Sequence, residues 1–330
     1  MKLDIGLAGL GRMGRVHARS LTSRCGRARL ACVYDADPTV ASEVGAEFDV
    51  PWVTTYEELL ERVAAVAIAT PTATHAPLTV AAAAAGRHVF CEKPISLDRD
   101  AAVGAVEACE TAGVVLQVGF HRRFDPDWVA AAARIAAGEL GEVQLFRSSL
   151  RDMDPPDPAF LAHSGGFFAD MAVHDLDTAR WLCGEVASVT AHGNAADPAF
   201  AAYGDIDTAV VVLRFVGGAI GVLDSSRSAR YGYECSTEVM GTLATARIDA
   251  PFPRGLEWRT PGQAGRAFAR DFEERFPFAY PAELDAFAAA VLDGTPARVT
   301  GRDAIAASDL AAAATESWRS GTSVSVEAPV

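Results

Sequence analysis

Lysine is almost absent from this chain of 330 residues. Lys2 and Lys93 are its only lysines, and every other basic residue is an arginine. Basic residues as a whole are outnumbered, because 43 acidic residues face 29 basic ones and the formal net charge is −14. Such a charge repels phosphate backbones and anionic lipid. It therefore argues against nucleic acid or a membrane surface as the main partner.

Long apolar runs and paired cysteines are also missing. The longest alanine-rich run, residues 80–85, falls far short of the roughly 18 residues that span a bilayer. The first residues lack the basic region and apolar stretch of a secretory signal. The six cysteines form no CxxC pair, which is typical of reduced, mostly buried thiols. We therefore expect a soluble, cytoplasmic protein of about two domains.

Short apolar runs alternate with helical stretches over the first 120 residues. The expected strands are residues 3–9, 29–35, 63–69, 88–91 and 114–119, and the expected helices are residues 14–23, 38–48, 77–85 and 97–112. Strict alternation predicts parallel strands joined by crossover helices, which is a doubly wound α/β sheet. We place this first domain at residues 1–121.

The alternation of strands and helices ends after residue 119. Strands are expected at residues 142–151, 187–193, 208–215, 219–225, 234–240 and 245–249, and helices at residues 127–137, 168–183, 281–292 and 302–318. Short glycine turns between consecutive strands, such as Val216-Gly217-Gly218, predict antiparallel pairing. The second domain, residues 122–330, is therefore predicted to be an α+β unit with an open, mostly antiparallel sheet.

A complete GxGxxG motif, Gly9-Leu10-Gly11-Arg12-Met13-Gly14, follows the first expected strand and opens a helix. Its glycines permit a tight turn and a close backbone approach to a pyrophosphate, which lies over the helix N-terminus. Asp35 ends the next strand, where a carboxylate can accept both ribose hydroxyls. No Arg or Lys in residues 36–50 could pair with a 2′-phosphate, so the sequence favours NAD over NADP.

Polar residues follow three further strands of the first domain. Thr70, Pro71 and His75 follow one strand, Glu92 and Lys93 end the next, and His121 and Arg122 follow the last. Loops at the carboxyl ends of parallel strands border the cofactor crevice. We therefore assign the cofactor to Gly9, Gly11, Arg12, Met13, Asp35, Thr70, Pro71, His75, Glu92, Lys93 and Arg122. Lys93 is the only lysine besides Lys2 at the N-terminus. Lysine, unlike arginine, can shift its pKa and exchange a proton.

A dense polar patch follows at Asp170, His174 and Asp177, which would share one face of a helix at spacing i, i+4, i+7. A histidine one turn from an aspartate is a suitable acid–base pair, because the carboxylate can orient the imidazole. Two carboxylates and one histidine are a poor zinc or iron set, so we predict no metal. A solvent-facing polar stripe is the alternative for this patch taken alone.

Taken together, these segments resemble the glucose–fructose oxidoreductase and inositol dehydrogenase family (Gfo/Idh/MocA). The similar pieces are GLGRMG, ATPTATHAPL, CEKPIS, VGFHRRFDP and GGFFADMAVHDLDTARWL, which run in the family's order. The resemblance implies an NAD-binding Rossmann domain at residues 1–121 and a substrate-binding and oligomerisation domain at residues 122–330. It also implies a catalytic triad of Lys93, Asp170 and His174.

Within the family the chain looks most like inositol dehydrogenases, through Phe120-His121-Arg122-Arg123-Phe124-Asp125 and Tyr231-Gly232-Tyr233. The residues expected to contact a polyol substrate are Lys93, His121, Arg122, Asp152, Asp170, His174 and Tyr233. His121 and the proline-rich loop after Asp152 depart from the pattern of those enzymes.

The resulting hypothesis is NAD-dependent oxidation of a secondary alcohol on a cyclitol, with myo-inositol or an isomer giving an inosose, by a homodimer or homotetramer. An aminocyclitol or sugar dehydrogenase of the same family is the alternative enzyme. A regulator that senses NAD without turnover is the alternative of another class.

Overall fold

The computed structural model describes residues 1–249 and 257–326 and divides the chain into two compact units. Unit 1 comprises residues 1–125 and 278–305, and unit 2 comprises residues 126–277 and 306–330, of which 250–256 and 327–330 lie outside the description. No helix within the described ranges is long and apolar enough to cross a membrane.

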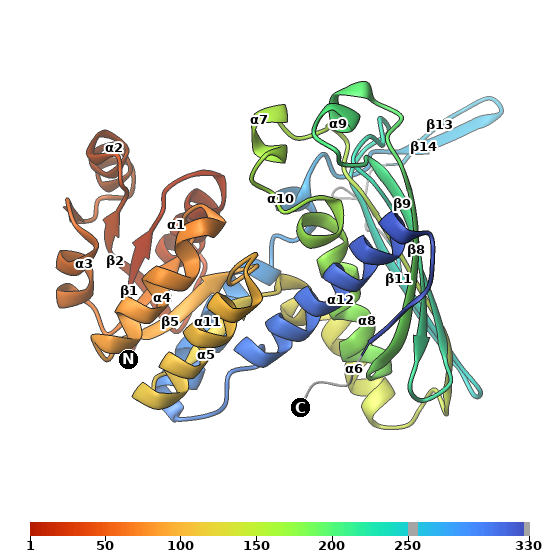
Figure 1. Ribbon diagram of the computed structural model, residues 1–330. Coiled ribbons are helices and arrows are strands. Elements are labelled where there is room, and N and C mark those ends of the chain that lie inside the picture. Colours follow the sequence, from red (N-terminus) through yellow and green to blue (C-terminus); the bar gives the residue numbers. More distant parts are fainter. Residues whose placement is uncertain (250–256, 327–330) are drawn as a thin grey trace. The chain divides into compact units, whose positions relative to one another are not determined.

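Unit 1 contains a six-stranded parallel sheet in the order β3-β2-β1-β4-β5-β6, of which Figure 1 labels β1, β2 and β5. Its strands are β1 (Leu3–Ala8), β2 (Ala28–Tyr34), β3 (Trp52–Val53), β4 (Ala65–Ile68), β5 (His88–Glu92) and β6 (Leu116–Gly119). Its helices are α1 (Arg12–Ser23), α2 (Pro38–Phe48), α3 (Tyr56–Arg62), η1 (Thr72–Thr74), α4 (His75–Ala84), α5 (Arg99–Ala112), η2 (His121–Phe124) and α11 (Ala279–Asp293). This strand order is that of a dinucleotide-binding Rossmann fold, and it confirms the expected doubly wound sheet.

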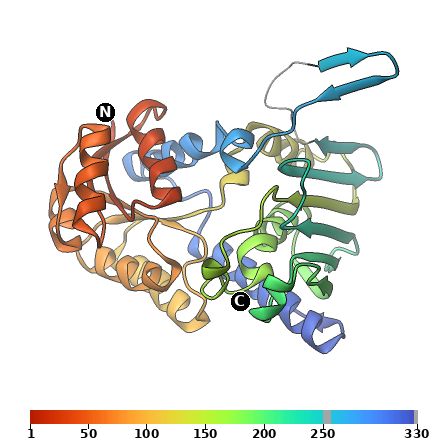
Figure 2. The ribbon, with the colours of Figure 1, turned by 90° about the horizontal axis from the view of Figure 1, so that it is seen from above.

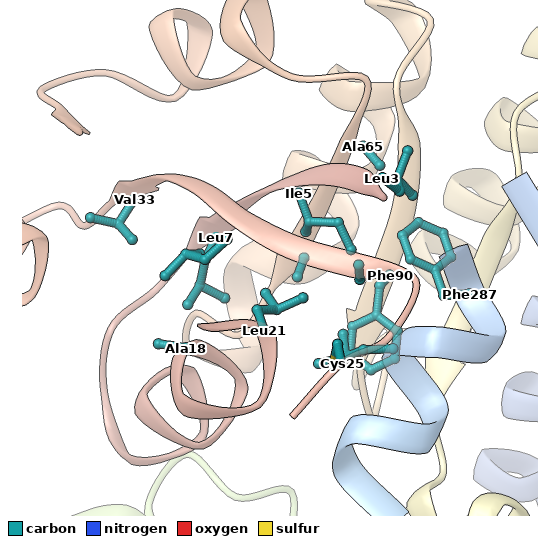
Figure 3. Close-up of a cluster of buried hydrophobic side chains, with 14 of the residues drawn as sticks. Leu3, Ile5, Leu7, Ala18, Leu21, Cys25, Val33, Ala65, Phe90 and Phe287 are labelled. Atoms are coloured by element: carbon teal, nitrogen blue, oxygen red, sulfur yellow. The ribbon is translucent and has the colours of Figure 1, made fainter. Parts of the chain in front are cut away.

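Unit 1 is not continuous in sequence, because α11 belongs to it. Leu284, Phe287 and Ala288 of α11 join the buried cluster formed by β1, β2, α1 and β5. Figure 3 shows Phe287 from α11 beside Phe90 and Leu3. The sequence-based division at residues 121 and 122 differs from this arrangement: unit 1 extends to Asp125 and regains Phe278–Ile305. The physical reason is that the apolar face of α11 completes the core of the first sheet.

Unit 2 is built on a seven-stranded sheet in the order β12-β11-β7-β10-β9-β8-β15. Its strands are β7 (Val143–Arg151), β8 (Val186–Asn194), β9 (Thr208–Phe215), β10 (Ile220–Ser226), β11 (Glu234–Gly241), β12 (Thr245–Ile248) and β15 (Val324–Ser325). All neighbouring strands are antiparallel except β7 and β10, which are parallel. The expectation of a mostly antiparallel sheet is therefore confirmed, with one parallel pair in its centre.

Helices cover one face of this second sheet. The helical segments are α6 (Pro126–Ala136), α7 (Pro158–Leu161), η3 (Phe168–Ala172), α8 (Val173–Cys183), α9 (Pro198–Ala202), α10 (Phe272–Arg275) and α12 (Gly301–Ser320), of which α12 begins in unit 1. Figure 1 shows α8 and α12 along the same side of the strands, and Figure 2 shows the separate hairpin of β13 (Glu257–Thr260) and β14 (Gln263–Arg266) projecting outward. On the face away from the helices, Val210, Val212 and Ile220 are exposed.

Candidate active site

The glycine-rich loop lies where β1 gives way to α1, at the point where the strand order reverses. Gly9 has a φ of +88°, and a Cβ there would lie 2.5 Å from the backbone nitrogen of Thr70. A Cβ on Gly14 would lie 2.0 Å from the carbonyl oxygen of Gly9, so the close packing of helix on strand requires glycine. Gly11 is different, because a Cβ there would meet no atom of the described chain within 4 Å.

The N-terminus of α1 is available for an anion. Gly11 is its N-cap residue, and no side chain in the described part of the chain caps it. The first amides of a helix without a side-chain cap form an anion-binding site, which the helix dipole strengthens. The open space at Gly11 and this helix end fit the pyrophosphate of a dinucleotide.

Asp35 lies directly after β2 and faces the same loop. Its Oδ2 accepts a hydrogen bond from the amide of Leu10 at 2.8 Å, and its Oδ1 accepts one from the amide of Asp37 at 3.0 Å. Asp37 itself caps α2 through the amide of Thr39 at 2.8 Å. A half-buried carboxylate held in this way suits the ribose hydroxyls of NAD.

The loops after β4 and β5 are tied together by His75. Its Nε2 lies 2.7 Å from the carbonyl oxygen of Thr70, and its Nδ1 lies 2.8 Å from that of Pro94. The ring is 2% exposed. Thr70 and Pro71 are thereby fixed beside Lys93, as the parallel register of β4 and β5 predicts. The contact of the His75 side chain with the cofactor stays a prediction, since both ring nitrogens already face the protein.

Lys93 is half-buried at the end of β5 and is joined to Pro94 by a cis peptide bond. The preceding residue, Glu92, turns inward. Its Oε1 lies 2.6 Å from His17 Nε2, and its Oε2 accepts a hydrogen bond from the amide of Lys93 at 3.3 Å. The Glu92 carboxylate therefore supports the backbone of Lys93, and its contact with the cofactor also stays a prediction.

The segment after β6 is more deeply buried than expected for a substrate-binding loop. All four residues of η2 are buried, and Arg122 is 2% exposed. His121 stacks on Tyr280 of α11, with ring centroids 5.1 Å apart. α11 therefore positions the segment that carries His121 and Arg122.

In unit 2, Asp170 and His174 lie on a helix that is not regular. Asp170 is in the π-helical turn η3, and His174 is in the first turn of α8. Both side chains are half-buried, whereas Asp177 is 1% exposed. Asp177 therefore lies within the packed interior, and the expectation that all three side chains share one helix face stays a prediction. π-helical turns occur often at functional sites.

Sequence reasoning missed Arg227, which pairs with Asp170. Its Nη2 lies 3.1 Å from Asp170 Oδ2, and its guanidinium carbon lies 5.5 Å from the centre of the Phe167 ring. Arg227 is 2% exposed. The opposite charges attract each other, so the buried guanidinium restricts the direction of the Asp170 carboxylate. The available signal was its position directly after β10, which matches the position of Asp152 after β7.

Three strand ends bring the other substrate candidates together. Arg151 pairs with Ser226 on one side and with Glu234 on the other, so Asp152, Arg227 and Tyr233 lie next to each other at one edge. The amide of Asp152 donates to the carbonyl oxygen of Ser226 at 2.9 Å, and its carbonyl oxygen accepts from Ala229 at 2.7 Å. Since Asp170 pairs with Arg227, this edge gathers most of the predicted substrate residues of unit 2.

Tyr231 and Tyr233 have different environments. Tyr233 is 6% exposed and precedes β11, where its amide donates to the carbonyl oxygen of Ala269 at 2.7 Å. Tyr231 is 52% exposed, and its hydroxyl donates to Glu234. Partial burial and the Glu234 carboxylate raise the pKa of Tyr231 to about 12. Both tyrosines precede β11, which begins at Glu234, as the expected strand at residues 234–240 predicts.

The fold and these strand ends define a dinucleotide-dependent oxidoreductase. The description "Oxidoreductase family, NAD-binding Rossmann fold" matches residues 3–120, and the GFO/IDH/MocA C-terminal domain matches residues 128–247. The chain belongs to the Gfo/Idh/MocA family of NAD-dependent oxidoreductases, as the motifs predicted.

The chain is similar to several inositol dehydrogenases over nearly its whole length. It is 37% identical over 324 residues to scyllo-inositol 2-dehydrogenase (NAD(+)) of Bacillus subtilis (strain 168), covering 97% of this chain and 95% of that one. It is 38% identical over 335 residues to myo-inositol 2-dehydrogenase of Thermotoga maritima, covering 98% and 99%. Scyllo-inositol dehydrogenase from Lactobacillus casei, solved with NAD(H) and scyllo-inositol, matches with a TM-score of 0.91 and 29% identity over 98% of this chain and 99% of that one.

Proposed function

We propose that this enzyme oxidises a secondary alcohol of a cyclitol, with myo-inositol or an isomer as substrate and an inosose as product. The observation that carries the proposal is the ion pair between Asp170 and Arg227. Asp170 precedes His174 by about one helical turn. Arg227 lies beside Asp152 and Tyr233 at the edge of the sheet. This edge offers hydroxyl, carboxylate and imidazole groups, which hydrogen-bond several hydroxyls of a neutral ligand. The relatives named above act on inositols.

The residues of unit 1 fit NAD. Gly9, Gly11, Arg12 and Met13 form the turn and the helix end for the pyrophosphate, and Asp35 accepts the ribose hydroxyls. Thr70, Pro71 and Arg122 border the same strand edge. When bound, NAD accepts the hydride from the substrate carbon.

The remaining chemistry is proton transfer and polarisation by side chains of the chain. His174 takes the proton of the reacting hydroxyl as general base. Asp170, held by Arg227, orients the substrate or the imidazole. Lys93 donates a hydrogen bond to the same oxygen and stabilises its developing negative charge. His121, Arg122, Asp152 and Tyr233 hold the other hydroxyls of the ring.

A substrate screen tests this function. The purified enzyme is incubated with NAD and with inositol isomers, aminocyclitols or hexoses, and NADH formation is followed by absorbance. The highest kcat/KM is expected for an inositol. A clear preference for an aminocyclitol or a hexose would establish the alternative dehydrogenase, while NAD binding without turnover on any alcohol would indicate a sensor of the NAD pool.

We also propose that the enzyme is a homodimer or homotetramer in the cytoplasm, acting in carbohydrate metabolism. The sheet face that carries Val210, Val212 and Ile220 supports the assembly, because exposed apolar side chains on one sheet face favour a protein partner. The six cysteines are all free thiols, which supports a reducing compartment. Light scattering after size exclusion measures the assembly, and a monomer at micromolar concentration would contradict it.

A further inference from the structure

Three ionisable side chains meet in the interior of unit 1, behind the end of β5. His17 comes from α1, Glu92 from β5 and Glu283 from α11, and one side-chain nitrogen or oxygen atom of each lies within 4.8 Å of the others. His17 Nε2 lies 2.6 Å from Glu92 Oε1, and the rings of Phe90 and Tyr280 meet the imidazole edge-on. The proposed function uses neither His17 nor Glu283.

Glu283 is the unusual member of this cluster. Its side chain is 0% exposed, and neither of its carboxyl oxygens has a hydrogen-bond partner among the described residues. Two neighbouring carboxylates that are both ionised would repel each other in a dry site. Burial, together with the charge of Glu92, raises the pKa of Glu283 well above its ordinary range. A protonated Glu283 has an O–H group that can donate to one of its neighbours.

Glu92 links this cluster to Lys93. Its Oε2 accepts a hydrogen bond from the amide of Lys93, which is the first residue beyond β5. Gly119 of β6 stands opposite Glu92, and a Cβ at that position would lie 2.9 Å from the same oxygen. The glycine therefore leaves room for the carboxylate to turn under the backbone of Lys93.

We propose that His17, Glu92 and Glu283 form a buried proton-sharing triad that positions Lys93, with Glu283 as its protonated member. The triad is a set of positioning residues, and the role proposed for it is exerted through Lys93. It rests on the proposed function only through the role of Lys93. It joins the helix of the glycine-rich loop, the strand that leads to Lys93 and the segment that returns to unit 1.

The other titratable groups around α11 have partners of their own. The Cys25 thiol donates to the carbonyl oxygen of Pro281 at 3.6 Å, and His121 stacks on Tyr280. Asp285 accepts the amides of Gly26 and Arg27, each at 2.7 Å. A pH effect that disappears on substitution of Glu283 alone can therefore be assigned to the triad.

Infrared spectroscopy tests the protonation without any assay of activity. At about pH 7 the wild-type protein should show the carbonyl band of a protonated carboxylic acid, and Glu283→Gln should lack it. Asp293→Asn is the matched control, since Asp293 is on the same helix but pairs with Arg27 at the surface. A spectrum without this band, or a band that survives in Glu283→Gln, would overturn the triad.

Kinetics then test the positioning of Lys93. Glu283→Gln keeps a neutral donor of the same shape and should retain most of the wild-type kcat. Glu283→Leu removes the donor and should lower kcat roughly 10- to 100-fold, because misplaced catalytic groups are costly, while KM for NAD changes little. Equal kcat values for the Leu variant and the wild type would overturn the positioning role even if the infrared band is present.

The competing interpretation is that His17, Glu92 and Glu283 bind a metal ion, and metal analysis distinguishes it from proton sharing. The purified enzyme should contain no stoichiometric zinc or manganese. A bound metal that is lost in Glu283→Gln would make the cluster a metal site and overturn proton sharing. Inactivity of the wild type toward all polyols would contradict the proposed function. The infrared experiment would still test the protonation of Glu283, because it needs no substrate.

Discussion

At the scale of single residues, the candidate chemistry depends on side chains held by specific partners. Asp170 is held by Arg227, Asp35 by two backbone amides, and Lys93 through its own amide by Glu92. Arg227 and Glu92 are more buried than the residues that they hold, and the partners of Asp35 are backbone groups. This arrangement keeps functional groups oriented before the ligand arrives, and it lowers the entropy lost on binding.

His174 is predicted to be the general base. His174→Ala should lower kcat roughly 10²- to 10⁴-fold, with much less effect on NAD binding, because only proton transfer is removed. Steady-state kinetics and an NAD titration by protein fluorescence measure the two quantities. His192→Ala, at an exposed position of β8, serves as the control and should behave like the wild type. Near-normal turnover of His174→Ala would leave the reaction without its proposed base.

Arg227 is predicted to act through Asp170. Arg227→Met keeps an unbranched, flexible side chain but removes the charge, so kcat should fall roughly 10- to 100-fold as Asp170 loses its orientation. KM for NAD should be unchanged, since Arg227 belongs to unit 2. Arg214→Met, on the exposed side of β9, is the matched control. If kcat of Arg227→Met equals that of the wild type, the Asp170–Arg227 pair has no part in the reaction.

Tyr233 is predicted to bind a substrate hydroxyl. Tyr233→Phe would leave that hydroxyl without a partner, which costs about 1–3 kcal/mol, so kcat/KM for myo-inositol should fall roughly 5- to 150-fold. Tyr231→Phe is the control, because its hydroxyl is exposed and bonds to Glu234. Equal kinetics of Tyr233→Phe and the wild type on every polyol would place Tyr233 outside the pocket and weaken the inositol assignment.

At the scale of elements, the glycine-rich loop separates two roles of glycine. Gly14 permits packing of α1 on the β1 loop, whereas Gly11 borders open space. The same residue type therefore serves the fold at one position and the ligand at the other.

Alanine substitutions should resolve these two roles. Gly11→Ala should fold with an unchanged melting temperature but bind NAD at least about tenfold more weakly, because its methyl group occupies the space for the pyrophosphate. Gly14→Ala should lower both the melting temperature and the NAD affinity, because its Cβ collides with the backbone of Gly9. Calorimetry measures the melting temperature, and fluorescence titration measures the NAD affinity. Tight NAD binding by Gly11→Ala would contradict a pyrophosphate site at Gly11.

The elements that the sequence predicted best are those whose signal is local. The apolar runs of β1, β2, β4, β5 and β6 and the GxGxxG turn follow from neighbouring residues, so the first sheet and the cofactor loop could be predicted. The π-helical turn at Asp170 has no comparable local signal. The Asp170–Arg227 pair joins residues 57 positions apart in sequence, and the membership of α11 in unit 1 depends on packing. These features needed the tertiary structure.

At the scale of the whole molecule, one buried acid links stability to pH. Because the folded-state pKa of Glu283 is raised, the folded protein binds this proton more tightly than the unfolded chain does. Stability from this group is therefore present in full below the unfolded pKa of about 4.3, and it is lost as pH rises toward the folded pKa.

Glu283→Gln should remove that dependence. From about pH 5 to about pH 8 its melting temperature should rise relative to that of the wild type, since the free energy difference grows by up to about 1.4 kcal/mol per pH unit. Asp293→Asn should show the opposite trend or none, because the pKa of Asp293 is lowered by Arg27. Thermal melts at matched ionic strength measure the difference. Parallel curves for Glu283→Gln and the wild type would contradict a raised pKa.

The return of residues 278–305 to unit 1 has a consequence for synthesis on the ribosome. Residues 1–125 emerge first, but Leu284, Phe287 and Ala288, which complete their core, are translated about 160 residues later. At about 5–20 residues per second this delay lasts roughly 8 to 32 seconds. During that interval the nascent first sheet carries an uncovered apolar surface, while the whole of residues 126–277 is made. The first part of the chain to be translated is therefore among the last to complete its core.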